Sequence, residues 1–177
     1  RRLVLLTVGA GGLLAPVLYF FGLERTTASN AVLLSNSESL FTIVLAFAFL
    51  RERLTPRGYA CIVAMAVGAF LVTTDLRLGD VAFVEHLVGN LILLGSAFGW
   101  AVTNTVSTDL LKRMRILPLL AIQLGLGALL VLPIAVATGA SLSVPIDVVP
   151  VLAFLALGGI GAFAILFFHA FRMIGAM

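Results

Sequence analysis

The feature that most constrains this chain is a succession of six apolar segments, each about 20 residues long, separated by polar links. They cover residues 3–23, 28–50, 57–74, 88–110, 116–137 and 149–171. A helix rises about 1.5 Å per residue, so each segment can cross the roughly 30 Å of hydrocarbon in a bilayer. Because lipid offers no partner for backbone polar groups, helices are the favoured form. We therefore predict an all-α integral membrane protein with six transmembrane helices.

The composition supports this class and excludes several functions. Hydrophobic residues make up 62% of the 177 residues and charged residues only 11%, too few to cover a soluble domain. The single cysteine, Cys61, excludes an intrachain disulfide. No metal-ligand pattern, phosphate-binding loop or nucleophile motif occurs, so we expect no enzymatic activity, cofactor or metal, and no nucleic-acid partner.

Basic residues alternate strongly between the two sides of the expected membrane. One side carries nine, Arg1, Arg2, Arg51, Arg53, Arg57, Lys112, Arg113, Arg115 and Arg172, whereas the other carries only Arg25 and Arg77. Short cytoplasmic links are enriched in Lys and Arg. This bias predicts that both ends of the chain lie in the cytoplasm. We expect a multi-pass protein of a bacterial-type inner membrane.

A glutamate, Glu38, lies near the centre of the second apolar segment, which would be a helix of about 34 Å. An acidic residue at that depth costs about 2.5–3.5 kcal/mol on insertion scales unless it faces protein or water. Ser35, Ser39 and Thr42 lie on or beside the same helical face. We favour a wet cavity in which Glu38 binds substrate or exchanges protons; the alternative is a glutamate that only fixes helix packing.

The fourth segment supplies a second candidate wall. Trp100, Thr103 and Asn104 belong to a stripe that also includes Ser96 and Ser107. Trp100 can stack on a substrate while its neighbours donate hydrogen bonds, or the stripe can bond neighbouring helices. The residues leave both interpretations open.

Three further polar residues are weaker candidates. Gln123 in the fifth segment can contact substrate, but a bond to a neighbouring helix is the favoured interpretation. Tyr19 near the end of the first segment is expected to be an interface anchor rather than a gate. His169 lies three residues before Arg172 and is expected to extend to the interface, with a proton relay as the alternative.

An internal echo indicates a repeat. A shift of 148 residues lays 18–28 on 166–176 and carries Gly11 onto Gly159. The shift crosses five helices, an odd number, so matching helices would cross in opposite directions. Inverted repeats of this kind occur in many secondary transporters.

Several motifs together resemble the EamA-type transporters of the drug/metabolite transporter superfamily. They are TTASNA at 26–31, SESLFT at 37–42, RERLTP at 51–56, GAFLV at 68–72, GNL at 89–91, AFGWA at 97–101 and FFHAFRMIGA at 167–176. Ser39 stands where the family often has Pro, which leaves a kink at Glu38 open, and Arg51 replaces a Gly. The resemblance implies that this chain is a fragment covering helices three to eight of a ten-helix inverted-repeat fold.

The resemblance also implies a domain organisation and a function. Residues 1–74 would be the last three helices of the first repeat, 75–87 an external connector, and 88–177 the first three helices of the second repeat. We expect a secondary transporter, an exporter or permease of small metabolites or drugs, working by alternating access. Its expected partners are the bilayer and a small-molecule substrate, with protons and a second copy of the chain as further candidates. The alternative is a non-transporting scaffold or assembly subunit.

Overall fold

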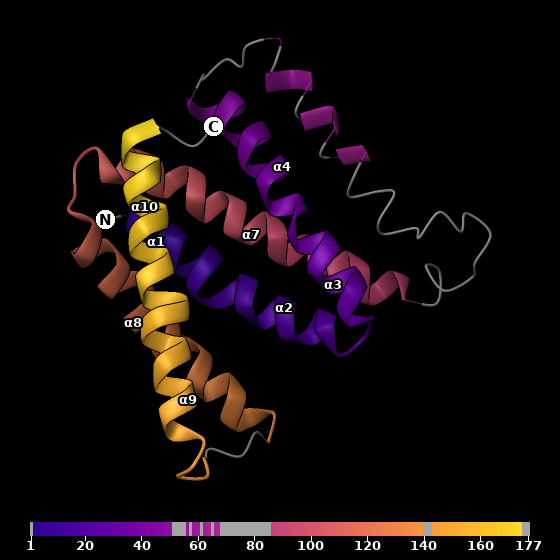
Figure 1. The fold of residues 1–177 in the computed structure, drawn as a ribbon, viewed down its shortest axis with the longest axis vertical. Coiled ribbons are helices and arrows are strands. Elements are labelled where there is room, and N and C mark those ends of the chain that lie inside the picture. The colour runs from indigo at the N-terminus through magenta and orange to yellow at the C-terminus, as the bar shows by residue number, and fades with distance from the viewer. Residues whose placement is uncertain are drawn as a thin grey trace.

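The computed structural model describes most of the chain as helices joined by short links (Figure 1). The described residues are 2–50, 56, 58–60, 62–64, 66–67, 86–139 and 143–174. These residues contain no β-strand. The predicted all-α membrane protein is therefore confirmed in the part of the chain that the structure describes.

Five helices within the described ranges are long and apolar enough to cross a membrane. They cover Arg2–Leu23, Ala28–Phe49, Leu87–Leu111, Ile116–Ala137 and Val149–Met173. We refer to the first two and the last of these as the first, second and last helices; the other two are α7 (Leu87–Leu111) and α8 (Ile116–Ala137). The third expected segment, 57–74, lies mostly outside the described residues.

The first and last helices share an unusual internal division. The first consists of α1 (Arg2–Thr7), the π-helical η1 (Val8–Leu14) and α2 (Ala15–Leu23). The last consists of α9 (Val149–Phe154), the π-helical η3 (Leu155–Ala162) and α10 (Phe163–Ile174). Each π segment contains three glycines, and glycine stabilises a regular α-helix less than other residues do. A shift of 148 residues carries η1 onto 156–162, within one residue of η3.

The second helix is also divided. It consists of α3 (Ala28–Ser35), α4 (Ser37–Leu45) and the π-helical η2 (Ala46–Leu50), with a turn at Asn36. Its start is capped by Thr27, whose side chain accepts a hydrogen bond from the Asn30 N–H at 3.2 Å. The expected connector 75–87 lies outside the described residues except for its last two, so the division into repeats stays a prediction.

Helix α7 is the centre of the bundle, with the first and second helices packed along it (Figure 1). The first helix runs antiparallel to α7, because Ala15 bonds Ser96 whereas the earlier Thr7 bonds the later Thr103. The second helix runs in the same direction as α7. When two membrane helices run in the same direction, the chain must cross the membrane an odd number of times between them. The predicted order agrees, because one segment, 57–74, is expected between 28–50 and 88–110.

Two apolar clusters lie at opposite ends of this bundle. At the end where the first and second helices join, Ala31, Leu34 and Leu93 are buried together. At the other end, the start of the first helix meets α7, α8 and α10. That cluster is formed by Leu110, Leu111, Leu119, Leu120 and Phe168, with Val4 packed against it.

Glycines allow the first helix to approach its neighbours closely. A Cβ on Gly127 of α8 would lie 2.9 Å from the Cα of Gly12, and one on Gly22 would lie 3.1 Å from the carbonyl oxygen of Gly89 in α7. No side chain fits at such distances, so the backbones are in contact. The last helix is different: it leaves nearly all its apolar side chains exposed, as a lipid-facing helix does.

Candidate functional site

The candidate site is built around a contact between the second helix and α7. The Glu38 Oε1 atom accepts a hydrogen bond from the Asn104 Nδ2 atom at 2.5 Å. Asn104 is 7% exposed and Glu38 is half-buried. Both residues were predicted from the sequence, and the structure brings them together although 66 positions separate them. A carboxyl group with an amide partner at this depth can bind a polar ligand or a proton.

Glu38 follows directly on an interruption of its helix. The Asn36 N–H donates to the Leu33 oxygen at 3.1 Å and the Ser39 N–H to the Asn36 oxygen at 3.2 Å, so both bonds span three residues rather than four. Directly before Asn36, the Ser35 hydroxyl donates a hydrogen bond to the Ala31 carbonyl oxygen at 2.7 Å. Bonds from a serine hydroxyl to the preceding helical turn often bend helices. The helix thus tightens beside Glu38 without a proline, while Asn36 keeps helical backbone angles.

The other members of the predicted stripe have different surroundings. Ser35 is bonded within its own helix, and Ser39 is exposed. Thr42, one turn after Glu38, is 5% exposed, and its Oγ1 atom has no hydrogen-bond partner among the described residues. A buried hydroxyl without a partner costs about 1–3 kcal/mol. Of the three residues, Thr42 is therefore the best candidate to bind a ligand together with Glu38.

The structure divides the predicted stripe on α7. The Ser96 hydroxyl donates to the Ala15 oxygen at 2.7 Å, and Thr103 lies 3.3 Å from the Thr7 oxygen and 3.1 Å from the Gly99 oxygen. These hydroxyls hold the first helix against α7. The geometry at Ser96 and Thr103 favours the helix-bonding interpretation that the sequence had left open.

Two of the weaker candidates also contact neighbouring helices. The Gln123 Nε2 atom of α8 donates to the Ser107 Oγ atom of α7 at 2.9 Å, which agrees with the favoured interpretation. Tyr19 packs against Trp100, with ring centroids 5.5 Å apart and an angle of 49° between the rings. The two aromatic side chains thus form one pair between the first helix and α7. His169 is exposed on α10, three residues before the exposed Arg172.

Sequence reasoning missed two polar features. Thr105 is 3% exposed, follows Asn104 on α7, and has an Oγ1 atom without a hydrogen-bond partner among the described residues. At the far end of α7, the Thr26 hydroxyl donates to the Asn90 Oδ1 atom at 2.6 Å and accepts from the Asn30 amide at 3.3 Å. Thr26 and Asn90 are 64 residues apart, so no local pattern indicates their bond.

The comparisons with known proteins agree with this architecture. A model of the EamA-like transporter family matches residues 1–74 and 87–177. An uncharacterized transporter of Methanothermobacter thermautotrophicus is 29% identical over 174 residues, which are 98% of this chain and 51% of that protein. The chain thus spans about half the length of this curated relative. No solved structure matches this chain. Together with the apolar helices, the match over nearly the whole sequence identifies a multi-pass membrane protein that belongs to the EamA-like transporter family.

Proposed function

We propose that the chain forms part of a secondary transporter that moves small metabolites or drugs by alternating access, with Glu38 as the proton or substrate partner. The observation that carries the proposal is the bond between Glu38 and Asn104, which joins two helices at membrane depth. The family match and the transporter name of the relative support the general function. The pairing of Glu38 with Asn104 supports a role of this contact in binding a substrate or a proton.

The surroundings of this bond favour a ligand role. The hydroxyl of Thr42, one turn after Glu38 on the same helix, is buried without a partner among the described residues. Unsatisfied hydroxyls of this kind are rare unless a ligand, water or a second conformation uses them. Glu38 also follows the tightened turn at Asn36, and a stretch of three-residue hydrogen bonds inside a helix often marks a functional position.

Proton coupling fits the chemistry of the pair. The Asn104 amide can donate to an oxygen of the Glu38 side chain whether or not the carboxyl group carries a proton. Substrate and proton can therefore compete for Glu38 without loss of the contact between the helices. Such competition converts a proton gradient into a substrate gradient when the site faces each side of the membrane in turn.

Alternating access is supported by the repeated π-helical segments. Residues 8–14 and the segment Leu155–Ala162 occupy corresponding places in two helices that the predicted repeat would relate by opposite orientation. π-helical turns often lie at functional sites and break the stiffness of a helix. We assign them the bending that lets each half of the transporter open.

A flux assay tests the proposal against the scaffold alternative. The full-length protein would be placed in liposomes and offered a broad panel of metabolites and drugs, with and without an imposed pH gradient. A transporter is expected to move at least one compound, faster when the gradient is present. A scaffold or assembly subunit would move none of them above the level of empty liposomes.

Thr42→Val is expected to increase stability and reduce transport. Valine has nearly the same shape as threonine but lacks the buried, unpartnered hydroxyl, so unfolding should become about 1 kcal/mol more costly. If the hydroxyl contacts the substrate, the KM for that compound should rise. Thermal unfolding in detergent and liposome flux measure the two effects.

Thr7→Val is the matched control for Thr42→Val. Thr7 is also buried in a membrane helix, but its hydroxyl already donates to the Val4 oxygen at 2.9 Å. This control should bring no gain in stability and no change in KM. Wild-type KM in Thr42→Val would exclude a substrate role for the Thr42 hydroxyl.

A further inference from the structure

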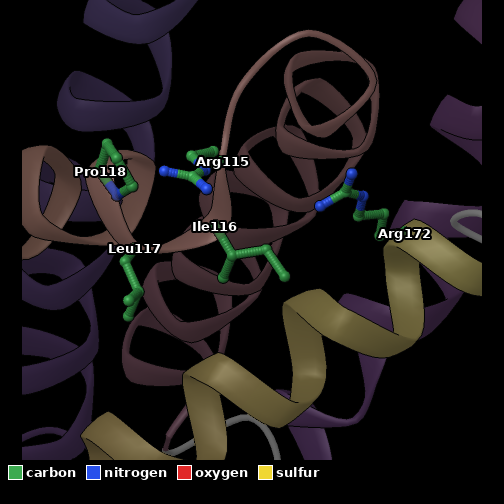
Figure 2. Close-up of a pocket in the computed structure, with 5 residues that line it drawn as sticks. All are labelled: Arg115, Ile116, Leu117, Pro118 and Arg172. Carbon is green, nitrogen blue, oxygen red and sulfur yellow. The ribbon is translucent and has the colours of Figure 1, made fainter.

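A cleft of about 540 Å³ lies between the start of α8 and the end of α10. The cleft is lined by Ile116, Leu117 and Pro118 of α8, by Arg115 directly before α8, and by Arg172 of α10. Figure 2 shows the Arg172 side chain directed from its helix back toward α8, with Ile116 between the two arginines. Two guanidinium groups from different helices thus flank one apolar wall.

Among the residues that the structure describes, no acidic group pairs with the two arginines. None of the residues that line the cleft is acidic, and within the described part of the chain neither guanidinium group has a carboxylate partner. Nearby Arg113 differs, because its Nη2 atom lies 3.8 Å from the Asp109 Oδ2 atom. The cleft therefore holds two positive charges that remain available to an anion.

The start of α8 adds to this positive field. Arg115 precedes the helix in an extended conformation and gives it no side-chain cap. The first amides of a helix lack intrahelical partners, and Pro118 has no N–H, so Ile116 and Leu117 present theirs. A helix of 22 residues also places the positive end of its dipole here. Phosphate oxygens accept hydrogen bonds from guanidinium groups and from free backbone amides.

The surroundings distinguish a lipid from a soluble anion. The walls provided by Ile116, Leu117 and Pro118 are apolar, and the cleft lies at the ends of two membrane-spanning helices. The described basic residues gather at this end of the bundle: Arg2, Lys112, Arg113, Arg115 and Arg172, against Arg25 at the other. Basic pockets between membrane helices on the cytoplasmic side bind anionic lipid headgroups.

We propose that this cleft is a binding site for an anionic phospholipid. Its phosphate lies between Arg115 and Arg172, and its glycerol and upper acyl chain cover Ile116 and Leu117. The lipid thereby links α8 to α10 next to the apolar cluster that includes Leu119 and Phe168. Because the last helix has few other contacts with the bundle, the lipid adds to its attachment.

Native mass spectrometry of the full-length protein tests the site. The purified protein is titrated with phosphatidylglycerol, with phosphatidylcholine and, separately, with inorganic phosphate. Wild type should bind phosphatidylglycerol in preference to phosphatidylcholine. Arg115→Gln/Arg172→Gln should weaken phosphatidylglycerol binding by about tenfold for each arginine removed.

The control variant Lys112→Gln/Arg113→Gln also removes two positive charges, both from the link that holds Arg115, without touching the cleft. It should keep wild-type affinity for phosphatidylglycerol. Equal loss in both double variants would overturn the proposal, because it would show attraction to bulk surface charge. Saturation by inorganic phosphate that displaces the lipid would also overturn it, in favour of a soluble anion. All four residues are exposed, so both variants should unfold at the wild-type temperature in lipid-free detergent.

Discussion

Glu38→Gln is expected to abolish transport driven by a pH gradient while the protein stays folded. Glutamine keeps the length of the side chain and an oxygen that accepts the Asn104 amide, so the bond at 2.5 Å between the two side chains has a replacement. It cannot bind or release a proton in the physiological range. Gradient-driven flux in liposomes should fall to the level of empty vesicles, whereas exchange of substrate across the membrane without a gradient should persist.

Ser107→Ala provides the control for this result. Ser107 also takes part in a bond between side chains of two helices, because it accepts from Gln123 at 2.9 Å, but it carries no titratable group. Its loss should lower the unfolding temperature, as the bonds between membrane helices average about 0.6 kcal/mol, and leave coupling intact. Wild-type gradient-driven flux in Glu38→Gln would rule out the coupling role and leave the packing interpretation.

Gly127→Ala is expected to destabilise the protein strongly. The new Cβ would lie 2.9 Å from the Cα of Gly12 and 2.8 Å from its carbonyl oxygen, and both are backbone atoms of another helix. The first helix and α8 must then move apart, which typically costs about 1–3 kcal/mol. Thermal unfolding in detergent should show a clear decrease in the midpoint temperature.

Gly125→Ala gives the matched comparison, two residues away on the same helix. A Cβ at Gly125 meets no atom within 4 Å, so alanine should be neutral or stabilising by up to about 1 kcal/mol through its better helix propensity. Equal midpoint temperatures for the two alanine variants would contradict the close contact between Gly12 and Gly127.

The sequence was sufficient to predict the long helices because the bilayer imposes one length and one polarity on each of them. The expected 3–23 and 116–137 agree with Arg2–Leu23 and Ile116–Ala137 within a residue. The interruption at Asn36 was harder to foresee. It depends on backbone hydrogen bonds that span three residues and on the bond of the Ser35 hydroxyl, and the sequence has no proline there that would predict it.

The candidate site was predictable as residues but not as contacts. Glu38 is conspicuous by its charge and Asn104 by its place in a polar stripe, yet their pairing depends on how the second helix lies on α7. The stripe alone did not indicate which of its two possible roles Thr103 has. A helix at the centre of a bundle has several buried faces, so polar residues on it bond different neighbours, and a single helix cannot indicate which.

The bond between Thr26 and Asn90 has a mechanical consequence for the site. It fixes the start of the second helix to the start of α7, whereas Glu38 lies 12 residues further along, which is about 18 Å of helix. A rotation of about 10° around the fixed end would displace Glu38 by about 3 Å over that length. An angular change of that size would therefore be enough to separate Glu38 from Asn104 while the bond between Thr26 and Asn90 stays in place.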